Sequence, residues 1–231
     1  GVAAAATEVL EDAGFHVVVP RASLCCGRPL YDYGFLGQAN KLLGDVLTHL
    51  KPSIEAGTPV VGLEPSCLAV FRDEMLDLRP HDQDARRLHE QIFTLAEFLT
   101  GHNYKPPVLN REIVVHGHCH QKAIIGLDAE KKLFEAMGAR AEILDDGCCG
   151  MAGSFGFEQQ KYALSMQIYE HTLGPRLREV PSQQVVVADG FSCKTQIEQA
   201  TGRRPLHLAQ LLQTAKQGDQ QRGDVLSVEA Y

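Results

Sequence analysis

The chain has 231 residues, of which 44% are apolar and 6% aromatic, and its formal net charge is −7 with His counted as neutral. This length fits one large domain or two small ones, and the composition excludes collagen-like, disordered and coiled-coil proteins. No apolar run approaches the roughly 20 residues of a membrane-spanning helix, no secretory signal opens the chain, and an acidic charge without a Lys/Arg cluster argues against nucleic acid as a partner.

The first part of the chain alternates between helix-type and strand-type patterns. Apolar residues at 3.6-residue spacing predict a helix over Val2–Ala13, ended by Gly14. The β-branched run Phe15–Val19 predicts a strand. A long helix is expected over Phe35–Glu55, and a buried strand over Pro59–Gly62 follows it.

The second part of the chain shows the same order of elements after one additional strand. That strand is predicted over Ile113–His116, and a helix over Ala129–Met137 follows it. A strand over Ala141–Leu144, a long helix over Phe157–Arg178 and a Val-rich strand over Val185–Ala188 complete the series. The alternation of strands and helices predicts parallel sheets covered by helices.

Cysteine spacing shows that the chain is an internal repeat. The strings Cys25-Cys26-Gly27 and Cys148-Cys149-Gly150 lie 123 residues apart, and the later Cys67 and Cys193 lie 126 residues apart. One insertion of three residues relates the two copies, which we name repeat one (residues 1–105) and repeat two (residues 111–215). The polar, aperiodic residues 216–231 are expected to form a loose tail.

The predicted fold class is α/β, with two pseudo-symmetric repeats that each form a small parallel sheet flanked by helices. The cysteines fall at the carboxyl ends of strands, where ligands collect in such sheets. Ser66 and Ser192 are candidate N-caps of the helices that begin near the later cysteines. Because Gly1 stands inside the first helix, we expect the chain to be a piece of a longer protein whose remainder supplies the first strand of repeat one.

A secreted disulfide framework has an even number of cysteines in a short chain, whereas this chain has seven cysteines in 231 residues. In repeat two, four thiols are expected to converge from three strand ends, which indicates a soft metal site that holds zinc or an iron–sulfur cluster. Adjacent cysteines favour a cluster, because structural zinc sites use Cys-x2-4-Cys spacing. A redox thiol site without metal remains an alternative. The four cysteines are Cys119, Cys148, Cys149 and Cys193.

Three strings carry a resemblance to a known family: residues 24–32 (LCCGRPLYD), 116–120 (HGHCH) and 147–156 (GCCGMAGSFG). They resemble the cysteine-rich CCG domain of the iron–sulfur subunits of glycolate oxidase, anaerobic glycerol-3-phosphate dehydrogenase and lactate utilisation proteins, and of heterodisulfide reductase. The likeness is strongest to the C-terminal part of FAD-binding and iron–sulfur-binding 2-hydroxy-acid oxidases, and it spans roughly residues 1–215. It implies a [4Fe-4S] cluster on Cys119, Cys148, Cys149 and Cys193 that passes electrons from a flavin to an acceptor.

The resemblance also implies partners and a location. The sequence contains neither a ferredoxin Cys-x2-Cys-x2-Cys-x3-Cys-Pro run nor a G-x-G-x-x-G flavin fingerprint. FAD and the ferredoxin-type clusters are therefore expected on another domain or subunit of a glycolate- or lactate-type oxidoreductase. A quinone is the candidate acceptor. The expected location is the cytoplasm, or the periphery of the inner membrane through a partner.

The family pattern is incomplete after the trailing cysteines. Its fullest form ends in Cys-x-x-Cys, whereas Glu64 and Gly190 stand three residues before the trailing cysteines of this chain. This argues against the noncubane clusters of heterodisulfide reductase. The candidate residues for an acceptor site are Cys25, Cys26, Cys67 and His120. The alternative functions are a thiol- or cluster-based disulfide or quinone reductase and a zinc-stabilised structural module.

Polar residues at the strand ends of repeat two are further candidates. His116, His118 and His120 alternate along an extended stretch and are predicted to point to one side, with Cys119 on the other. Such a group could bind metal or relay protons to a quinone. Asp145 and Asp146 are predicted to lie on opposite faces, which argues against an acid/base pair.

Overall fold

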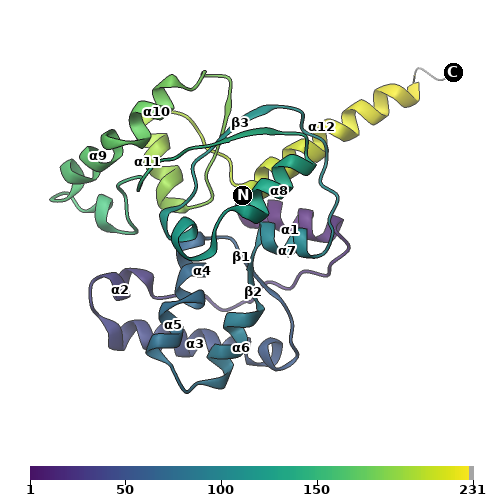
Figure 1. Cartoon of the computed structure of the whole chain (residues 1–231). Coiled ribbons are helices and arrows are strands. Elements are labelled where there is room, and N and C mark those ends of the chain that lie inside the picture. The colour runs from purple at the N-terminus through teal and green to yellow at the C-terminus, as the bar shows by residue number, and fades with distance from the viewer. Residues whose placement is uncertain (229–231) are drawn as a thin grey trace.

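The computed structural model describes residues 1–228, with side chains through residue 218, and consists of two small parallel sheets surrounded by helices (Figure 1). The elements of repeat one are α1 (Val2–Asp12), α2 (Arg28–Asp32), α3 (Leu36–Glu55), β1 (Val60–Gly62), α4 (Pro65–Arg72), α5 (Glu74–Leu78), α6 (Gln83–Gln91), β2 (Ile92–Thr94) and α7 (Leu95–Gly101).

The second half of the chain forms the other sheet and its helices. Its elements are β3 (Glu112–Val115), the π-helical turn η1 (Gln121–Ile125), α8 (Asp128–Ala136), β4 (Arg140–Ile143), the 3-10 turn η2 (Phe155–Phe157), α9 (Tyr162–His171), α10 (Leu173–Glu179), β5 (Val185–Val187), α11 (Phe191–Thr201) and α12 (Leu208–Val228).

Both sheets are parallel, which confirms the predicted α/β class. In repeat one, β1 pairs with β2, with Val60 opposite Ile92. In repeat two the strand order is β4-β3-β5, so the buried β3 lies at the centre. A single parallel bridge from Val187 to Leu206 extends this sheet at the place that β2 occupies in repeat one. The carboxyl ends of β4, β3 and β5 therefore lie side by side.

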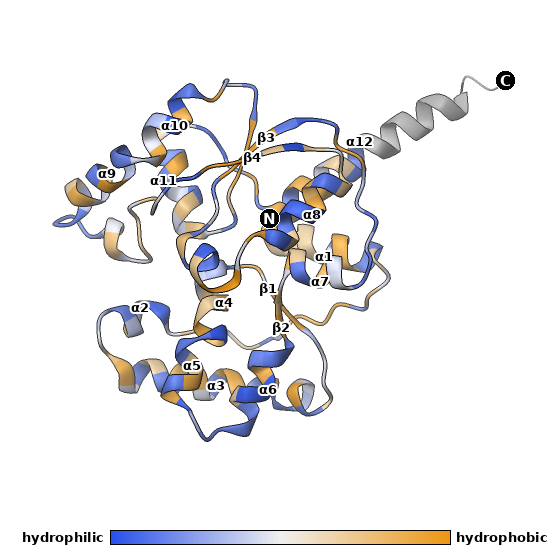
Figure 2. Ribbon diagram, in the orientation of Figure 1, coloured by the Kyte–Doolittle hydropathy of each residue, from blue (hydrophilic) through white to orange (hydrophobic). Residues whose placement is uncertain are grey.

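Four helices at the ends of the repeats hold the two halves of the chain together. α1 packs against α12, and α7 packs against α8, so the first helix of each repeat contacts the last helix of the other. Figure 1 shows these four helices together on one side of the molecule, between the sheet of repeat one and the sheet of repeat two. Their apolar faces, with those of β3 and β5, form one shared core that includes Ala5, Leu99, Ile113, Phe134 and Leu212. In Figure 2 the strands at the centre are largely hydrophobic, whereas hydrophilic residues gather on the outer faces of the helices.

Each repeat also has a core of its own beside its cysteines. The core of repeat one includes Cys26, Leu43 and Met75, and that of repeat two includes Cys149, Tyr169 and Cys193. Burying a large apolar side chain contributes roughly 1.5–3 kcal/mol. The thiols are therefore built into packed apolar walls. Among the described residues, no helix has the length and apolar character needed to cross a membrane.

Two predicted elements differ from the observed ones. The run Phe15–Val19 forms no strand, because no described segment pairs with it and Val18 and Val19 are 76% and 67% exposed. The helix predicted over Phe157–Arg178 is divided into α9 and α10 at Thr172. Pro175 lacks the N–H that a continuous helix would donate to the carbonyl group of His171, so the helix breaks there.

The predicted serine caps are also wrong. The N-cap of α4 is Glu64, whose side chain accepts a hydrogen bond from the Ser66 N–H. The N-cap of α11 is Gly190, and the Ser192 hydroxyl donates to the carbonyl oxygen of Gly153 at 3.3 Å. Each serine lies two residues inside its helix rather than at the cap.

The expected loose tail begins within a helix. α12 starts at Leu208 on an apolar face that packs in the shared core, and it continues through residue 216 to Val228. Once a helix has nucleated, each further residue adds a backbone hydrogen bond at little cost, which extends it into polar sequence. Residues 229–231 lie outside the described part of the chain.

Candidate metal centre

The four cysteines of repeat two come from three adjoining places at one edge of the sheet. Cys119 follows β3 and begins the turn that leads into η1, and Cys148 and Cys149 lie in the loop after β4. Cys193 lies in the first turn of α11, directly after β5. Because β4, β3 and β5 are parallel neighbours, their carboxyl ends bring these thiols together.

Contacts between the sulfur atoms shift the pKa values of the thiols. Hydrogen bonds from Cys119 and Cys149 lower the pKa of Cys148 to about 2, and the N–H of Gly150 also donates to its Sγ at 3.3 Å. The same contacts raise the pKa values of Cys119 and Cys149. A hydrogen bond from Cys149 lowers the pKa of Cys193 to about 6 against the effect of burial. Negative charge is thus stabilised on Cys148 and Cys193 rather than on Cys119 and Cys149.

Gly150 is required by the turn that presents the thiols. Its φ is +90°, a conformation that residues with a side chain rarely adopt, and a Cβ there would collide with the backbone oxygen of Ser165. In repeat one, Gly27 has a φ of +78°, and a Cβ would lie 3.1 Å from the Cα of Ala39. The glycine of each Cys-Cys-Gly string therefore serves both a left-handed turn and a close helix approach.

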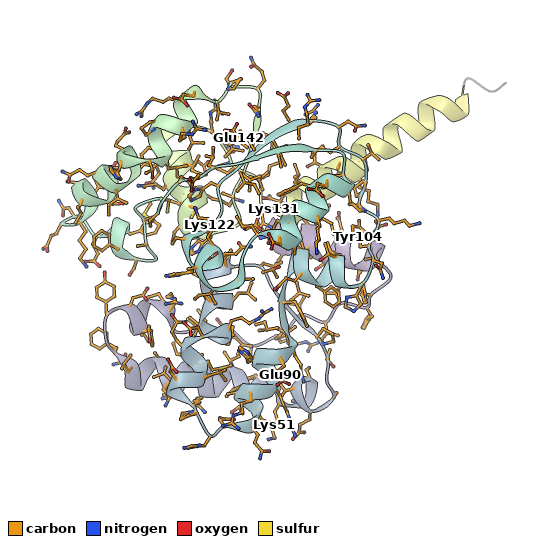
Figure 3. All side chains as sticks on the ribbon, in the orientation of Figure 1. Lys51, Glu90, Tyr104, Lys122, Lys131 and Glu142 are labelled. Atoms are coloured by element: carbon orange, nitrogen blue, oxygen red, sulfur yellow. The ribbon has the colours of Figure 1, made fainter. Side chains whose placement is uncertain are left out.

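A buried ionic group stands behind the thiols of repeat two. The Nδ1 atom of His116 lies 2.5 Å from the carboxylate of Asp146, which also accepts a hydrogen bond from Lys122 at 2.9 Å. Burial lowers the pKa of His116, but the contacts with Asp146 and Cys193 outweigh it and raise the pKa to about 9. The other nitrogen, Nε2, is buried without a hydrogen-bond partner. Figure 3 shows Lys122 near the middle of the molecule.

The histidine therefore faces the thiols. One ligand atom each from His116, Cys149 and Cys193 lies within 4.8 Å of the others. Because Asp146 engages Nδ1, the free Nε2 is the nitrogen available to a group held by these sulfurs. Asp145 is exposed while Asp146 is buried, which agrees with the prediction that the two side chains lie on opposite faces.

The predicted alternation of the three histidines ends at Cys119. The chain turns into a helical conformation there, so the ligand atoms of His118, Cys119 and His120 lie within 4.8 Å of one another. The Nδ1 atom of His118 accepts a hydrogen bond from the backbone N–H of His120 at 3.2 Å. Burial and the neighbouring histidines lower the pKa of His118 to about 3. Cys119 thus lies on the same side as two histidines rather than opposite them.

The cysteines of repeat one form a second, smaller group. The Sγ atoms of Cys26 and Cys67 are 2.9 Å apart, and the Sγ of Cys25 accepts a hydrogen bond from the N–H of Gly27 at 3.4 Å. Arg28 is buried beneath them and pairs with Glu74 at 2.5 Å. The cysteine groups are three thiols in repeat one and four in repeat two, among the described residues.

The two groups lie close to each other across the repeat boundary. The carboxylate of Glu64 caps α4, and its Oε2 accepts a hydrogen bond from the backbone N–H of Phe191 at 2.8 Å. The positive charge of Arg28 is among the influences that lower the pKa of His118. The residue that stands where the fullest motif has a cysteine thus connects the two helices that carry Cys67 and Cys193.

Comparison with known proteins agrees with this geometry. The family model of the cysteine-rich domain named CCG matches residues 1–72 and 114–198, which together make up most of the chain. The chain belongs to the CCG cysteine-rich domain family. The matched ranges contain all seven cysteines of the CCG chain.

Two of three curated relatives of the CCG chain are longer than the chain, and the third has a similar length. The chain is 29% identical over 192 residues to D-2-hydroxyglutarate dehydrogenase of Pantoea ananatis, which covers 80% of the chain and 18% of that protein. It is 30% identical over 218 residues to one subunit of the anaerobic glycerol-3-phosphate dehydrogenase of Escherichia coli K12, covering 90% and 53%. Identity to lactate utilization protein A of Bacillus subtilis is 25%, covering 90% of each. The chain thus spans about a fifth of the first relative and about half of the second.

The buried pair of His116 and Asp146 beside the cysteines of the CCG domain was not predicted from the sequence. The sequence pattern drew attention to His116 and Asp146 separately, but not as a pair. His116 directly follows β3 and Asp146 lies in the loop after β4. Adjacent parallel strands bring the residues after them together, so the two positions could have been paired from the predicted sheet. Arg28 and Glu74 carried no such signal, because they meet through helix packing.

Proposed function

We propose that the chain is the iron–sulfur electron-transfer module of a flavin-dependent 2-hydroxy-acid oxidoreductase of the glycolate or lactate type. One [4Fe-4S] cluster is held by Cys119, Cys148, Cys149 and Cys193. The observation that carries the proposal is the convergence of these four thiols at the carboxyl ends of three neighbouring parallel strands. The family membership and the names of the relatives agree with it.

The donor set fits such a group in number, charge and surroundings. Four thiolates are the usual ligands of iron–sulfur clusters. Cys149 and Cys193 are buried in the core of repeat two, while Cys119 and Cys148 are partly accessible. The glycine N–H that donates to Cys148 is the kind of backbone donor that stabilises sulfur charge. The site is therefore dry on one side and open on the other.

When bound, the cluster supplies single-electron transfer between a flavin and an acceptor. The residues of this chain would position the cluster and tune its reduction potential. The four cysteines hold it, Gly150 lets the turn close on it, and Asp146 fixes the orientation of His116. Lys122 keeps the buried carboxylate of Asp146 neutralised. His120 and the open side near Cys119 are the proposed route toward an acceptor such as a quinone.

The proposal assigns the remaining chemistry to partners. FAD and the ferredoxin-type clusters belong to another domain or subunit, as the partial coverage of the relatives allows. The module is proposed to act in the cytoplasm, or at the inner membrane through that partner.

One observation favours a second candidate. His116, Cys149 and Cys193 lie within 4.8 Å of one another, which also suits a single tetrahedral zinc ion with one further ligand. In that case the chain would be a zinc-stabilised module.

Metal analysis after anaerobic purification tests both candidates. For an iron–sulfur module we expect about four irons and about four sulfides per chain and a broad absorbance at about 400 nm. Cys148→Ser should remove the iron, and the matched variant Cys25→Ser, at the equivalent position of repeat one, should retain it. Stoichiometric zinc without colour, or a full iron content in Cys148→Ser, would contradict the proposal.

A further inference from the structure

The thiols of repeat one have an arrangement that the cluster proposal leaves unused. Cys26 and Cys67 are 41 residues apart in the chain, yet their sulfur atoms lie 2.9 Å apart, which is within contact distance. Cys26 is buried, Cys67 is partly buried, and Cys25 is exposed. One accessible thiol thus adjoins a shielded pair.

The surroundings of the pair favour a thiolate on one partner. The hydrogen bond with Cys67 lowers the pKa of Cys26 to about 7, and the backbone and charge of Arg28 add to the effect. Two nitrogens of Arg28, Nε and Nη2, are buried without a hydrogen-bond partner. Contact with Cys26 raises the pKa of Cys67, which therefore holds the proton. A thiolate next to a thiol is the reactant pair of disulfide exchange.

Cys25 interacts electrostatically with the Cys26–Cys67 pair. Its charge is among the influences that raise the pKa of Cys67. Its Sγ also accepts a hydrogen bond from the N–H of Gly27 at 3.4 Å. Adjacent cysteines rarely bridge each other, so the favoured partner of Cys25 in an exchange is Cys67 rather than Cys26.

We propose that repeat one is a dithiol–disulfide redox site, in which Cys26 and Cys67 form a reversible disulfide and Cys25 is the entry thiol for a low-molecular-weight disulfide. This activity does not depend on the cluster of repeat two. It assigns the two Cys-Cys-Gly turns to different chemistry.

The steps balance with a disulfide as oxidant. The Cys25 thiolate attacks one sulfur of the external disulfide, which forms a mixed disulfide and releases the first small thiol. Cys67 then passes its proton to the neighbouring Cys26 thiolate and attacks the Cys25 sulfur, and the displaced second small thiolate takes that proton from Cys26. The Cys26 thiolate attacks Cys67, which restores the Cys25 thiol and leaves the Cys26–Cys67 disulfide. Two protein thiols are oxidised and one external disulfide is reduced to two thiols.

Oxidised glutathione is the probe that tests the proposal. The anaerobically purified, metal-loaded chain is treated with it, quenched by alkylation and mapped as non-reduced peptides by mass spectrometry. The expected product joins the Cys26 and Cys67 peptides and disappears on treatment with a thiol reductant. Cys25→Ser should give the same cross-link at least tenfold more slowly. Cys67→Ser should stop at a glutathione adduct on Cys25.

Three outcomes would overturn the proposal. These are a lasting glutathione adduct on Cys25 of the wild-type chain, a cross-link that forms equally fast in Cys25→Ser, and thiols that resist oxidation because they hold a metal ion. The last is read by counting metal in Cys25→Ser, Cys26→Ser and Cys67→Ser. The same mapping in Cys148→Ser separates this proposal from the cluster: the cross-link should form there whether or not iron is bound. Circular dichroism spectra identify any variant that fails to fold.

Discussion

The two Cys-Cys-Gly turns share a backbone and differ in what surrounds it. In both, the first cysteine accepts a hydrogen bond from the glycine N–H, at 3.4 Å in repeat one and 3.3 Å in repeat two, and both glycines have positive φ. In repeat two, the neighbouring strand β3 adds Cys119 and His116 to the site. In repeat one, the described neighbours are instead the buried pair Arg28 and Glu74. The conformation of the turn is therefore common to both repeats, whereas the residues at the adjoining strand ends differ and determine which chemistry each site can perform.

The largest expected difference between the turns concerns their glycines. Gly150→Ala would drive a Cβ into the backbone oxygen of Ser165, which cannot move without shifting α9, so we expect the free energy of unfolding to fall by more than about 5 kcal/mol. Gly27→Ala is strained but meets only Ala39 at 3.1 Å, and should cost about 2 kcal/mol. Urea unfolding under reducing conditions measures both. Equal losses would show that the two turns are packed alike.

The buried ion pair of repeat one should matter nearly as much. Arg28 and Glu74 have side-chain exposures of 6% and 11%, so Arg28→Gln leaves a buried carboxylate unpaired and should cost about 4 kcal/mol. The double variant Arg28→Met/Glu74→Leu is the control, because it removes both charges and should recover most of the loss. Urea unfolding of both variants tests this. An unchanged stability in Arg28→Gln would mean that the pair is solvated.

A third contrast lies between the equivalent helices α1 and α8. By the 124-residue offset of Gly14 and Gly138, the buried Glu130 of α8 corresponds to the buried Ala6 of α1. Burial raises the pKa of Glu130 to about 7, above its ordinary value of 4.5. The folded state therefore binds this proton more tightly, so the contribution of Glu130 to stability is most favourable below about pH 4.5 and falls as the pH rises through 7.

Glu130→Gln should remove this pH dependence. The variant should be more stable than the wild type by about 3 kcal/mol at pH 8 and equal to it near pH 4. The measurement is the free energy of unfolding in urea at both pH values. A constant difference at the two pH values would assign the effect to packing rather than to charge.

The smallest expected effect concerns the polar bridge between the repeats. Lys161 donates to the Tyr33 hydroxyl at 2.8 Å and lies 4.5 Å from the centre of its ring, at a partly exposed position. Lys161→Ala should lower the thermal midpoint slightly, corresponding to about 1 kcal/mol. Arg140→Ala, which removes a fully surface pair with Glu112, is the matched control and should have no effect. A larger loss would show that the repeats depend on this bridge.

Much of the fold follows from local patterns, and the failures have specific causes. Val-rich strands such as β5 and the Gly-terminated helices α1 and α8 were predictable because periodicity and caps are local. The run Phe15–Val19 has the composition of a strand, but whether a strand forms depends on a neighbouring strand that the sequence pattern does not reveal. The division at Thr172 could have been found from Pro175 alone.

The candidate site was predictable to a different extent. The cysteine spacing predicted a group of four thiols in repeat two and a group of three in repeat one. It could not show that Cys26 touches Cys67, because that contact depends on how α4 packs against the first turn. Nor could it show that Glu64 connects α4 to Phe191, since the residues are brought together only by the association of the two repeats.

The iron content of two complete site variants shows whether the two repeats hold different chemistry. One variant carries Ser at Cys25, Cys26 and Cys67, and the other carries Ser at Cys119, Cys148, Cys149 and Cys193. The first variant should bind as much iron and sulfide as the wild-type chain, and the second should bind none. Iron retained in the second variant, or lost in the first while its fold is intact, would show that the chemistry is not divided between the repeats in this way.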